Sequence, residues 1–257
     1  MRSLPRIMVA PNGARLQKSD HPALPITEAE MVACAKACFA AGAGGLHAHL
    51  RDPNGGHLLD AAAYQRLVAR LKETVPQMAV QITTEAVGQY GPDVQMEIAL
   101  ISGADMVSVS IREILRAGQP AAAAFFRTCQ QAGIAVQHIL YDLEDCRVLV
   151  EALDPASLAA PDLQLLFVLG RYTAGGASSP AELDPFVDWM KAHRLTPDWA
   201  VCAFGAAETD CLCRAVARGG KCRVGFENAL VLSDGRIARD NAEKVSDLAA
   251  RLAESAA

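Results

Sequence analysis

The sequence predicts a (β/α)8 barrel, the TIM-barrel class of α/β fold, as a single domain over residues 1–257. Short apolar runs alternate with amphipathic stretches eight times along the chain, and such regular alternation implies a parallel sheet. Eight units in about 250 residues is the usual size of this barrel. No G-x-G-x-x-G or phosphate-binding loop follows the first run, which disfavours the alternative, an open doubly wound sheet.

Each expected unit is a strand followed by a helix with a recognisable start or end. Thr27 and Glu30 form a capping box for the first helix, while Asp60 caps the second and Pro76 ends it. The expected strands cover residues 7–10, 45–50, 79–84, 106–110, 134–140, 163–169, 199–204 and 221–226. The expected helices cover residues 27–42, 60–75, 92–102, 119–132, 144–153, 180–193, 207–218 and 241–253.

Composition disfavours several classes of protein. The formal net charge is -5 and no basic patch is present, so nucleic-acid binding is not expected. No apolar run approaches the roughly 18 residues of a membrane span, and the amino-terminal segment lacks the apolar region of a signal peptide. Eight cysteines are too sparse for a disulfide scaffold at this length. We therefore expect reduced thiols in a cytoplasmic protein.

Polar side chains gather where the predicted strands end, which is where barrel enzymes place their reactive groups. The most informative motif is His47-Ala48-His49, because residues two apart in a strand point to the same side. The two imidazoles can converge on one divalent metal, or they can be hydrogen-bonded histidines of a polar core. The other strand ends carry Asn12, Arg51, Thr83, Thr84, Glu85, Ser108, Ser110, His138, Tyr141, Arg171, Tyr172, Arg223, Glu227 and Asn228.

A catalytic metal needs a third protein ligand, and Glu227 is the expected one. The eighth strand closes the barrel beside the first, so its end lies near the second strand, which carries His47 and His49. Two histidines and a glutamate with an open position form a pattern of catalytic zinc. The alternative for Glu227 is a salt bridge to Arg223 or Arg51.

These motifs resemble those of the β-keto acid cleavage enzymes, and the resemblance covers essentially the whole chain. The combination of an early H-x-H-x-R-D with a late R-V-G-x-E is specific, whereas either motif alone is weak. The matching segments are Pro25-Ile26-Thr27, Ala41-Gly42-Ala43, His47-Ala48-His49-Leu50-Arg51-Asp52, Thr83-Thr84, Arg223-Val224-Gly225-Phe226-Glu227-Asn228 and Asp240-Asn241-Ala242.

The resemblance implies a homo-oligomer, a tetramer or a dimer, that holds Zn2+ through His47, His49 and Glu227. Such enzymes react a β-keto acid with acetyl-CoA as co-substrate, giving acetoacetate and a new CoA thioester by Claisen and retro-Claisen chemistry. By the same resemblance, Arg223 positions the substrate and the basic group. The expected substrate-binding residues are Thr83, Thr84, Ser108, Arg51 and Asn12.

Three departures from the family pattern concern the general base. Relatives often have an acid directly after the metal-binding glutamate, but this chain has Asn228, which cannot accept a proton near neutral pH. His138 stands near a position where many relatives have a carboxylate, and Glu85 replaces a common glycine. Our hypothesis is that Glu85 or His138 acts as the base. The alternative for Glu85 is an ion pair with Arg51 or Arg112.

Other functions remain open on the sequence alone. A metal-dependent lyase or hydrolase can use a similar barrel, although amidohydrolases usually place the His-x-His motif on the first strand and add a late aspartate. A metal-binding or ligand-sensing protein that has lost its base is the non-enzymatic reading. Dependence on acetyl-CoA separates the cleavage enzyme from all of these. The β-keto acid itself is expected to be selected by the loops at 11–25 and 171–179.

Overall fold

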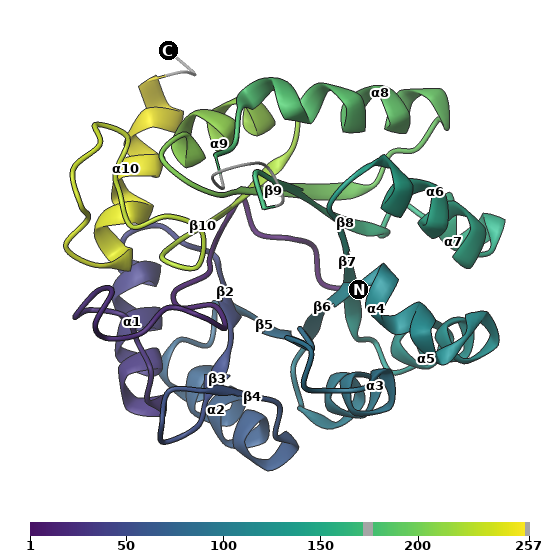
Figure 1. The fold of residues 1–257 in the computed structure, drawn as a ribbon, viewed down its shortest axis with the longest axis horizontal. Coiled ribbons are helices and arrows are strands. Elements are labelled where there is room, and N and C mark those ends of the chain that lie inside the picture. The colour runs from purple at the N-terminus through teal and green to yellow at the C-terminus, as the bar shows by residue number, and fades with distance from the viewer. Residues whose placement is uncertain (172–176, 255–257) are drawn as a thin grey trace.

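The computed structural model, which describes residues 1–171 and 177–254, is a closed barrel of parallel strands surrounded by helices (Figure 1). The order around the barrel is β1-β10-β9-β8-β7-β6-β5-β2, so the first and last strands of the chain are neighbours. The (β/α)8 prediction is confirmed. The barrel strands are β1 (Ile7–Val9), β2 (Gly45–Ala48), β5 (Ala79–Thr83), β6 (Met106–Ser110), β7 (Ala135–Leu140), β8 (Gln164–Leu169), β9 (Asp198–Ala203) and β10 (Lys221–Val224).

The helices begin where the sequence places their caps. The Thr27 hydroxyl accepts from the Glu30 amide and the Glu30 carboxylate accepts from the Thr27 amide, which is the expected capping box. Asp60 accepts from the Ala63 amide at 2.7 Å. The helices are α1 (Glu28–Ala40), α2 (Ala61–Thr74), α3 (Pro92–Ile101), α4 (Ile111–Ile114), α5 (Gln119–Gln131), α6 (Leu143–Ala152), α7 (Pro155–Leu158), α8 (Asp184–Ala192), α9 (Glu208–Ala217) and α10 (Asn241–Glu254).

Short elements are where the structure departs from the expected units. The chain after β2 forms an antiparallel hairpin of β3 (Leu50–Arg51) and β4 (His57–Leu58), turned by Asp52, whose side chain accepts from two backbone amides. The expected helix at 180–193 is divided into a 3₁₀ turn, η3 (Pro180–Leu183), and α8. Another 3₁₀ turn, η1 (Leu115–Ala117), follows α4.

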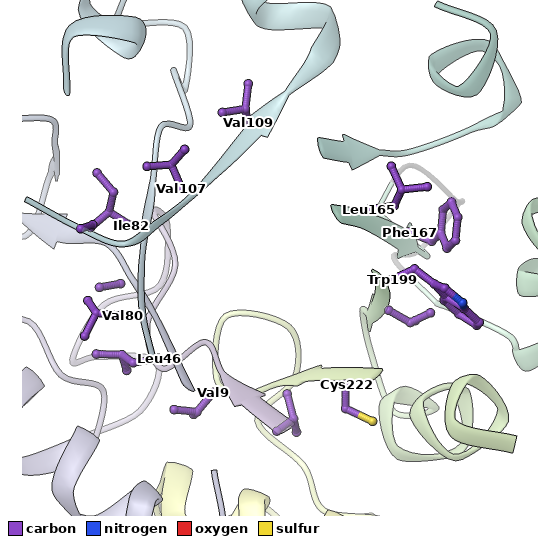
Figure 2. Packing of buried hydrophobic residues seen from close by; sticks show 14 of the residues in the cluster. Val9, Leu46, Val80, Ile82, Val107, Val109, Leu165, Phe167, Trp199 and Cys222 are labelled. Atoms are coloured by element: carbon purple, nitrogen blue, oxygen red, sulfur yellow. The ribbon is translucent and has the colours of Figure 1, made fainter. Parts of the chain in front are cut away.

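Alternation along the strands divides the buried side chains into two sets. One set faces outward and packs under the helices, as Figure 2 shows for Val9, Leu46, Val107 and Phe167 among others. Burial of each such side chain contributes about 1.5–3 kcal/mol. The other set fills the barrel interior and consists of Leu4, Met8, Ala79, Met106, Ala135, Ile139, Leu166, Val168, Ala200 and Cys202.

The amino-terminal segment closes one end of the barrel. Figure 1 shows the amino terminus lying across the barrel from β1, near β6 and β7. Leu4 is buried in the interior set, and its amide donates to Asp198 at the start of β9. The amino ends of the strands are therefore covered, and the polar strand ends lie at the opposite rim. None of the helices in the described residues has the length and apolar character needed to cross a membrane.

Candidate active site

Three of the predicted residues converge at the carboxyl end of the barrel. His47 lies near the end of β2 with its side chain on the interior side of the barrel, His49 lies just beyond that strand, and Glu227 follows β10. The two histidine Nε2 atoms are 3.1 Å apart. The Glu227 carboxylate oxygens lie 3.7 Å from Nε2 of His47 and 3.5 Å from Nε2 of His49. All three side chains are at least nine-tenths buried, and their ligand atoms lie within 4.8 Å of one another.

A buried glutamine beside His47 determines which nitrogen of the His47 ring carries the proton. Gln81 is fully buried on β5, and its amide oxygen lies 2.8 Å from Nδ1 of His47. The Gln81 amide nitrogen donates to the Gln137 side chain at 3.0 Å, which fixes the orientation of the Gln81 amide. An amide oxygen only accepts, so Nδ1 of His47 carries the proton and Nε2 presents its lone pair to the other two residues.

Two glycines allow Glu227 to reach the histidines. Gly225 has φ +149°, and a Cβ there would lie 2.3 Å from the carbonyl oxygen of Ala10. The backbone can therefore turn sharply after β10, and the Glu227 amide donates to that same carbonyl at 3.1 Å. Gly13, with φ +57°, lies under the Glu227 side chain, where a Cβ would come 2.7 Å from Cγ. The expected strand at 221–226 ends early, at Val224, because of this turn.

The charges around the three residues favour metal ligation. Burial opposes ionisation of Glu227, but the neighbouring His49 and Arg223 hold its pKa well below the usual range. Burial, helped by the nearby Arg223 guanidinium, holds the pKa of His47 well below its ordinary value. A neutral imidazole beside an ionised carboxylate is the protonation state in which both can bind a cation.

Arg223 is a buried cation beside this cluster. Its Nη2 atom lies 3.9 Å from a Glu227 oxygen and 3.9 Å from the sulfur of Cys202. Its Nε and Nη1 atoms have no hydrogen-bond partner among the described residues, although the side chain is only 6% exposed. A buried guanidinium with unused donors can donate hydrogen bonds to the oxygen atoms of a ligand.

The cluster opens into a narrow cleft of about 20 Å³, which Glu85 and Arg171 border. A Glu85 oxygen pairs with Arg171 at 3.1 Å and with Arg15 at 3.4 Å. Burial raises the pKa of the Glu85 carboxyl above its ordinary value. The cleft is lined by His47, His49, Thr83, Glu85, Ile139, Tyr141, Val168, Arg171, Cys202, Phe204, Arg223 and Glu227. Tyr172, also named above as a strand-end group, lies outside the described residues.

Arg51 and Asn12, expected to bind substrate, hold loops in the structure. Neither lines the cleft. The Arg51 guanidinium donates to four backbone carbonyls, those of Asn12, Gly13, Leu16 and Gly55, so it ties the loop after β1 to the hairpin. The Asn12 amide donates to the carbonyls of Pro25 and His49. The ion pairs of Glu85 accordingly involve Arg15 and Arg171, while Arg112 pairs with two aspartates near α6.

The hydroxyl residues have different positions. The Thr83 hydroxyl lies in the cleft and accepts from the Glu85 amide at 3.0 Å. Thr84 is buried outside the cleft lining, where its hydroxyl donates to the Ser108 carbonyl at 2.9 Å. The Ser108 hydroxyl is fully buried and has no partner within the described part of the chain. Because Ser108 alternates with Val107, which packs under the helices, it faces the barrel interior.

His138 does not reach the site. It alternates along β7 with Ile139 and Tyr141, which line the cleft, so its ring points to the helix layer. There it contacts the ring of Phe126 on α5, with centroids 4.9 Å apart. The hypothesis that His138 replaces the missing base is therefore wrong, because neighbouring residues of a strand face opposite sides of the barrel wall.

Asn228 turns away from the cleft toward a buried ion pair. Its amide nitrogen donates to Glu208 at 3.0 Å and to the Arg223 carbonyl at 3.0 Å. Glu208 on α9 pairs with Lys244 on α10 at 2.5 Å, and both side chains are 2% exposed. Glu208 also accepts from the Gly225 amide. This network holds the turn that carries Glu227.

Sequence reasoning missed three residues that support the site. Gln81 carried a usable signal, because it is a polar residue in an apolar strand on the same face as Thr83. His57 on β4 is buried beside His49, with ring centroids 5.4 Å apart, and its Nε2 donates to the Glu85 carbonyl. Glu208 gave no local signal, since its partners come from distant parts of the chain.

Comparison with known proteins identifies a family to which the sequence is similar. Residues 6–257 match the family model described as beta-keto acid cleavage enzyme. The chain is 23% identical over 249 residues to the 3-keto-5-aminohexanoate cleavage enzyme of Fusobacterium nucleatum, covering 91% of this chain and 85% of the relative. It is 24% identical over 253 residues to the 3-oxoadipate:acetyl-CoA acetyltransferase of Cupriavidus necator, covering 95% and 87% of the two chains.

Solved structures support the fold. The complex of ObcA with oxaloacetate superposes with a TM-score of 0.67 at 16% identity. That match covers 92% of this chain, which spans 65% of the length of ObcA. KGPDC from Streptococcus mutans superposes with a TM-score of 0.54 at 14% identity, covering 98% and 99% of the chains. Because the family model matches residues 6–257, nearly the whole of this chain, the chain belongs to the beta-keto acid cleavage enzyme family.

Proposed function

We propose that this chain is a zinc-dependent β-keto acid cleavage enzyme that uses acetyl-CoA as co-substrate. The observation that carries the proposal is the convergence of His47, His49 and Glu227 beside Arg223, in a cleft at the carboxyl end of the barrel. This is where barrel enzymes perform their chemistry. The products would be acetoacetate and a CoA thioester of the remaining acyl group.

The three converging side chains suit zinc. Two imidazole nitrogens and one carboxylate are a donor set of catalytic zinc sites, which leave one position open. Zinc–nitrogen bonds of roughly 2.0–2.1 Å in a tetrahedron separate two nitrogens by about 3.3 Å, and the Nε2 atoms of His47 and His49 are 3.1 Å apart. The Glu227 oxygen nearer His47 is buried without a hydrogen-bond partner among the described residues. When bound, the metal would supply Lewis-acid polarisation of the ketone and carboxylate oxygens.

Residues around the metal position would bind and orient the substrate. The Thr83 hydroxyl already accepts from the Glu85 amide, so its own proton is available to a substrate carboxylate. The unused Nε and Nη1 donors of Arg223 can stabilise the oxygen that becomes negative as the enolate forms. Ser108 on β6 does not line the cleft, but its unpaired hydroxyl is the further donor that we propose on the interior side of the barrel wall.

Glu85 is our candidate for the proton acceptor. It lies in the cleft, and burial raises the pKa of its carboxyl toward the range in which a base is effective. Glu85 would take a proton from the carbon between the ketone and the carboxylate. That carbon would attack the acetyl carbonyl and release CoA thiolate. The thiolate would then cleave the original ketone–carbon bond, giving the new thioester, and the proton would return to acetoacetate.

A substrate screen tests the function. We would incubate zinc-loaded protein with a panel of β-keto acids, including 3-oxoadipate and 3-keto-5-aminohexanoate, the compounds in the relatives' names. Acetoacetate and the new thioester would be detected by mass spectrometry, with metal content measured in parallel. We expect products only when acetyl-CoA is present. Turnover without acetyl-CoA would indicate a lyase or hydrolase, and a chain unable to bind zinc stoichiometrically would contradict the proposal.

The base is tested with a matched pair of variants. Glu85→Gln keeps the size of the side chain but cannot accept the proton, so we expect turnover to fall by about 10²–10⁴-fold. His138→Asn alters a side chain on the other face of the barrel wall and should keep most of its rate. If Glu85→Gln keeps the full rate, Glu85 is not the base.

The homo-oligomer that the family resemblance implies stays a prediction, which sedimentation velocity would test.

A further inference from the structure

His138 is a buried imidazole that the proposed reaction does not use. The residue is 4% exposed, its Nδ1 atom is buried without a hydrogen-bond partner among the described residues, and none of those residues forms a hydrogen bond with its Nε2 atom. Natural proteins rarely bury a polar group without a partner. The ring lies on the outer face of β7, against Phe126 of α5. The imidazole is therefore available to a ligand on that face, where His138 lines a cavity.

A cavity lies in front of this ring. It has a volume of about 330 Å³, against about 20 Å³ for the cleft described above. Pockets of roughly 300–1,000 Å³ hold small organic ligands. The cavity is bounded by β7, by α5 and by the chain from the end of α6 through α7. Its apolar wall consists of Phe126, Ile134, Val136, Ala152, Leu153 and Leu163.

The charged groups around this cavity leave one cation unmatched. Each of the acids already has a partner: Glu151 pairs with an arginine of α6, Asp154 caps α7, and Asp162 pairs with the amino terminus. Arg127 is exposed and lines the same cavity, and it forms no hydrogen bond or ion pair with residues 1–171 and 177–254. The unmatched groups are thus a cation at the rim and an imidazole at the wall.

We propose that the cavity between β7, α5 and α7 binds a small oxo- or hydroxy-carboxylic acid with an apolar tail. Arg127 pairs with the carboxylate, and the apolar wall receives the tail. His138 forms a hydrogen bond with the oxo or hydroxyl oxygen, because a neutral imidazole both donates and accepts. This site is separate from the cleft that contains His47, and β7 lies between the two.

Calorimetry with matched probes tests the proposal. The probes are 3-hydroxyhexanoate, hexanoate, which lacks the hydroxyl group, and 3-hexanol, which lacks the carboxylate. We expect 3-hydroxyhexanoate to bind about tenfold tighter than either analogue, as expected when one hydrogen bond or ion pair is lost. Equal binding of hexanoate and 3-hydroxyhexanoate would overturn the role of His138, and equal binding of 3-hexanol would overturn that of Arg127.

Variants locate the bound acid. Arg127→Gln removes the rim cation, and Ala123→Phe fills the cavity from α5 without altering the barrel interior. Both should weaken 3-hydroxyhexanoate binding at least tenfold, and the acid should shift the imidazole NMR signal of His138. Arg66→Gln, an exposed position on α2, is the control and should bind as the wild type does. Unchanged affinity in both cavity variants would overturn the proposal. The proposal would also be overturned if the wild type bound no acid and Ala123→Phe changed only the oligomeric state.

Discussion

Replacing Gln81 by leucine should weaken zinc binding without touching a metal ligand. The amide oxygen of Gln81 accepts from Nδ1 of His47 at 2.8 Å, and this bond keeps Nε2 deprotonated and aimed at His49 and Glu227. Leucine has a similar volume but no acceptor. The ring of His47 would keep a buried N–H without a partner and would lose the bond that fixes its tautomer.

The size of the effect follows from this one bond. Removing such a support typically lowers metal affinity by about 10–100-fold, which corresponds to roughly 1.4–2.7 kcal/mol. Leaving a buried donor unpaired costs about 1–3 kcal/mol, so the two estimates agree. We would titrate zinc against a chromophoric chelator at pH 7 and measure urea unfolding of the metal-free protein. The expected result is a loss of roughly 30-fold in zinc affinity for Gln81→Leu, the middle of that range.

Gln164→Leu is the matched control. Gln164 is also a buried glutamine facing the barrel interior, 2% exposed, but it donates to the Arg2 carbonyl at the opposite end of the barrel. Both variants should lose about 1 kcal/mol or more of unfolding free energy, because each breaks a buried hydrogen bond. Only Gln81→Leu should lose zinc affinity. If both variants bind zinc as tightly as the wild type, the support assigned to Gln81 is refuted.

Three further predictions concern the turn, the cavity and the buried pair. Gly225→Ala should lose more than about 3 kcal/mol of stability in urea, because its Cβ would lie 2.3 Å from the Ala10 carbonyl oxygen. Gly219→Ala, at φ +87° in open space, should lose only about 1–2 kcal/mol, and equal losses would contradict the account. Burial lowers the pKa of His138 from 6.5 to about 4, so the unfolded chain binds its proton first and stability falls as the pH drops from 6.5 to 4. His138→Phe should reduce that fall by up to about 3 kcal/mol, and a variant that keeps the wild-type pH dependence would count against it. Asn228→Asp should lose about 2–4 kcal/mol in thermal unfolding at pH 7, because it sets a second carboxylate against Glu208; a variant as stable as the wild type would disprove this.

The barrel could be predicted because its signal is regular and long-range in the sequence. Eight strand–helix repeats, with caps such as those at Thr27 and Asp60, leave few alternative topologies. The β3–β4 hairpin could not be found in the same way. Its strands are two residues long, and the turn depends on hydrogen bonds to the Asp52 side chain, so no periodic pattern exists. The division of the helix at 180–193 likewise leaves no mark in the apolar pattern.

The convergence of His47, His49 and Glu227 could be predicted from strand geometry, whereas the contacts of the neighbouring residues could not. His47 and His49 follow from two-residue alternation, and Glu227 follows from closure of the barrel. The same alternation, counted from Tyr141, already places His138 on the outer face of β7. Arg51 belongs to the motif that matches the family, and the expected role for it is substrate binding. Its actual contacts are loop carbonyls, and these depend on tertiary packing that position in the chain does not reveal.

The amide at Asn228 and the buried Glu208 explain each other. The Asn228 side chain donates to Glu208 and to the Arg223 carbonyl, and an ionised acid cannot donate. Glu208 is itself held by Lys244 and by the Gly225 amide, so the acceptor at this place is fixed by α9 and α10. An acid at 228 would therefore face a carboxylate in a buried site. Among the described residues that line the cleft, the carboxylates are Glu227, which lies against the histidines, and Glu85. Glu85 is therefore the proton acceptor that we propose.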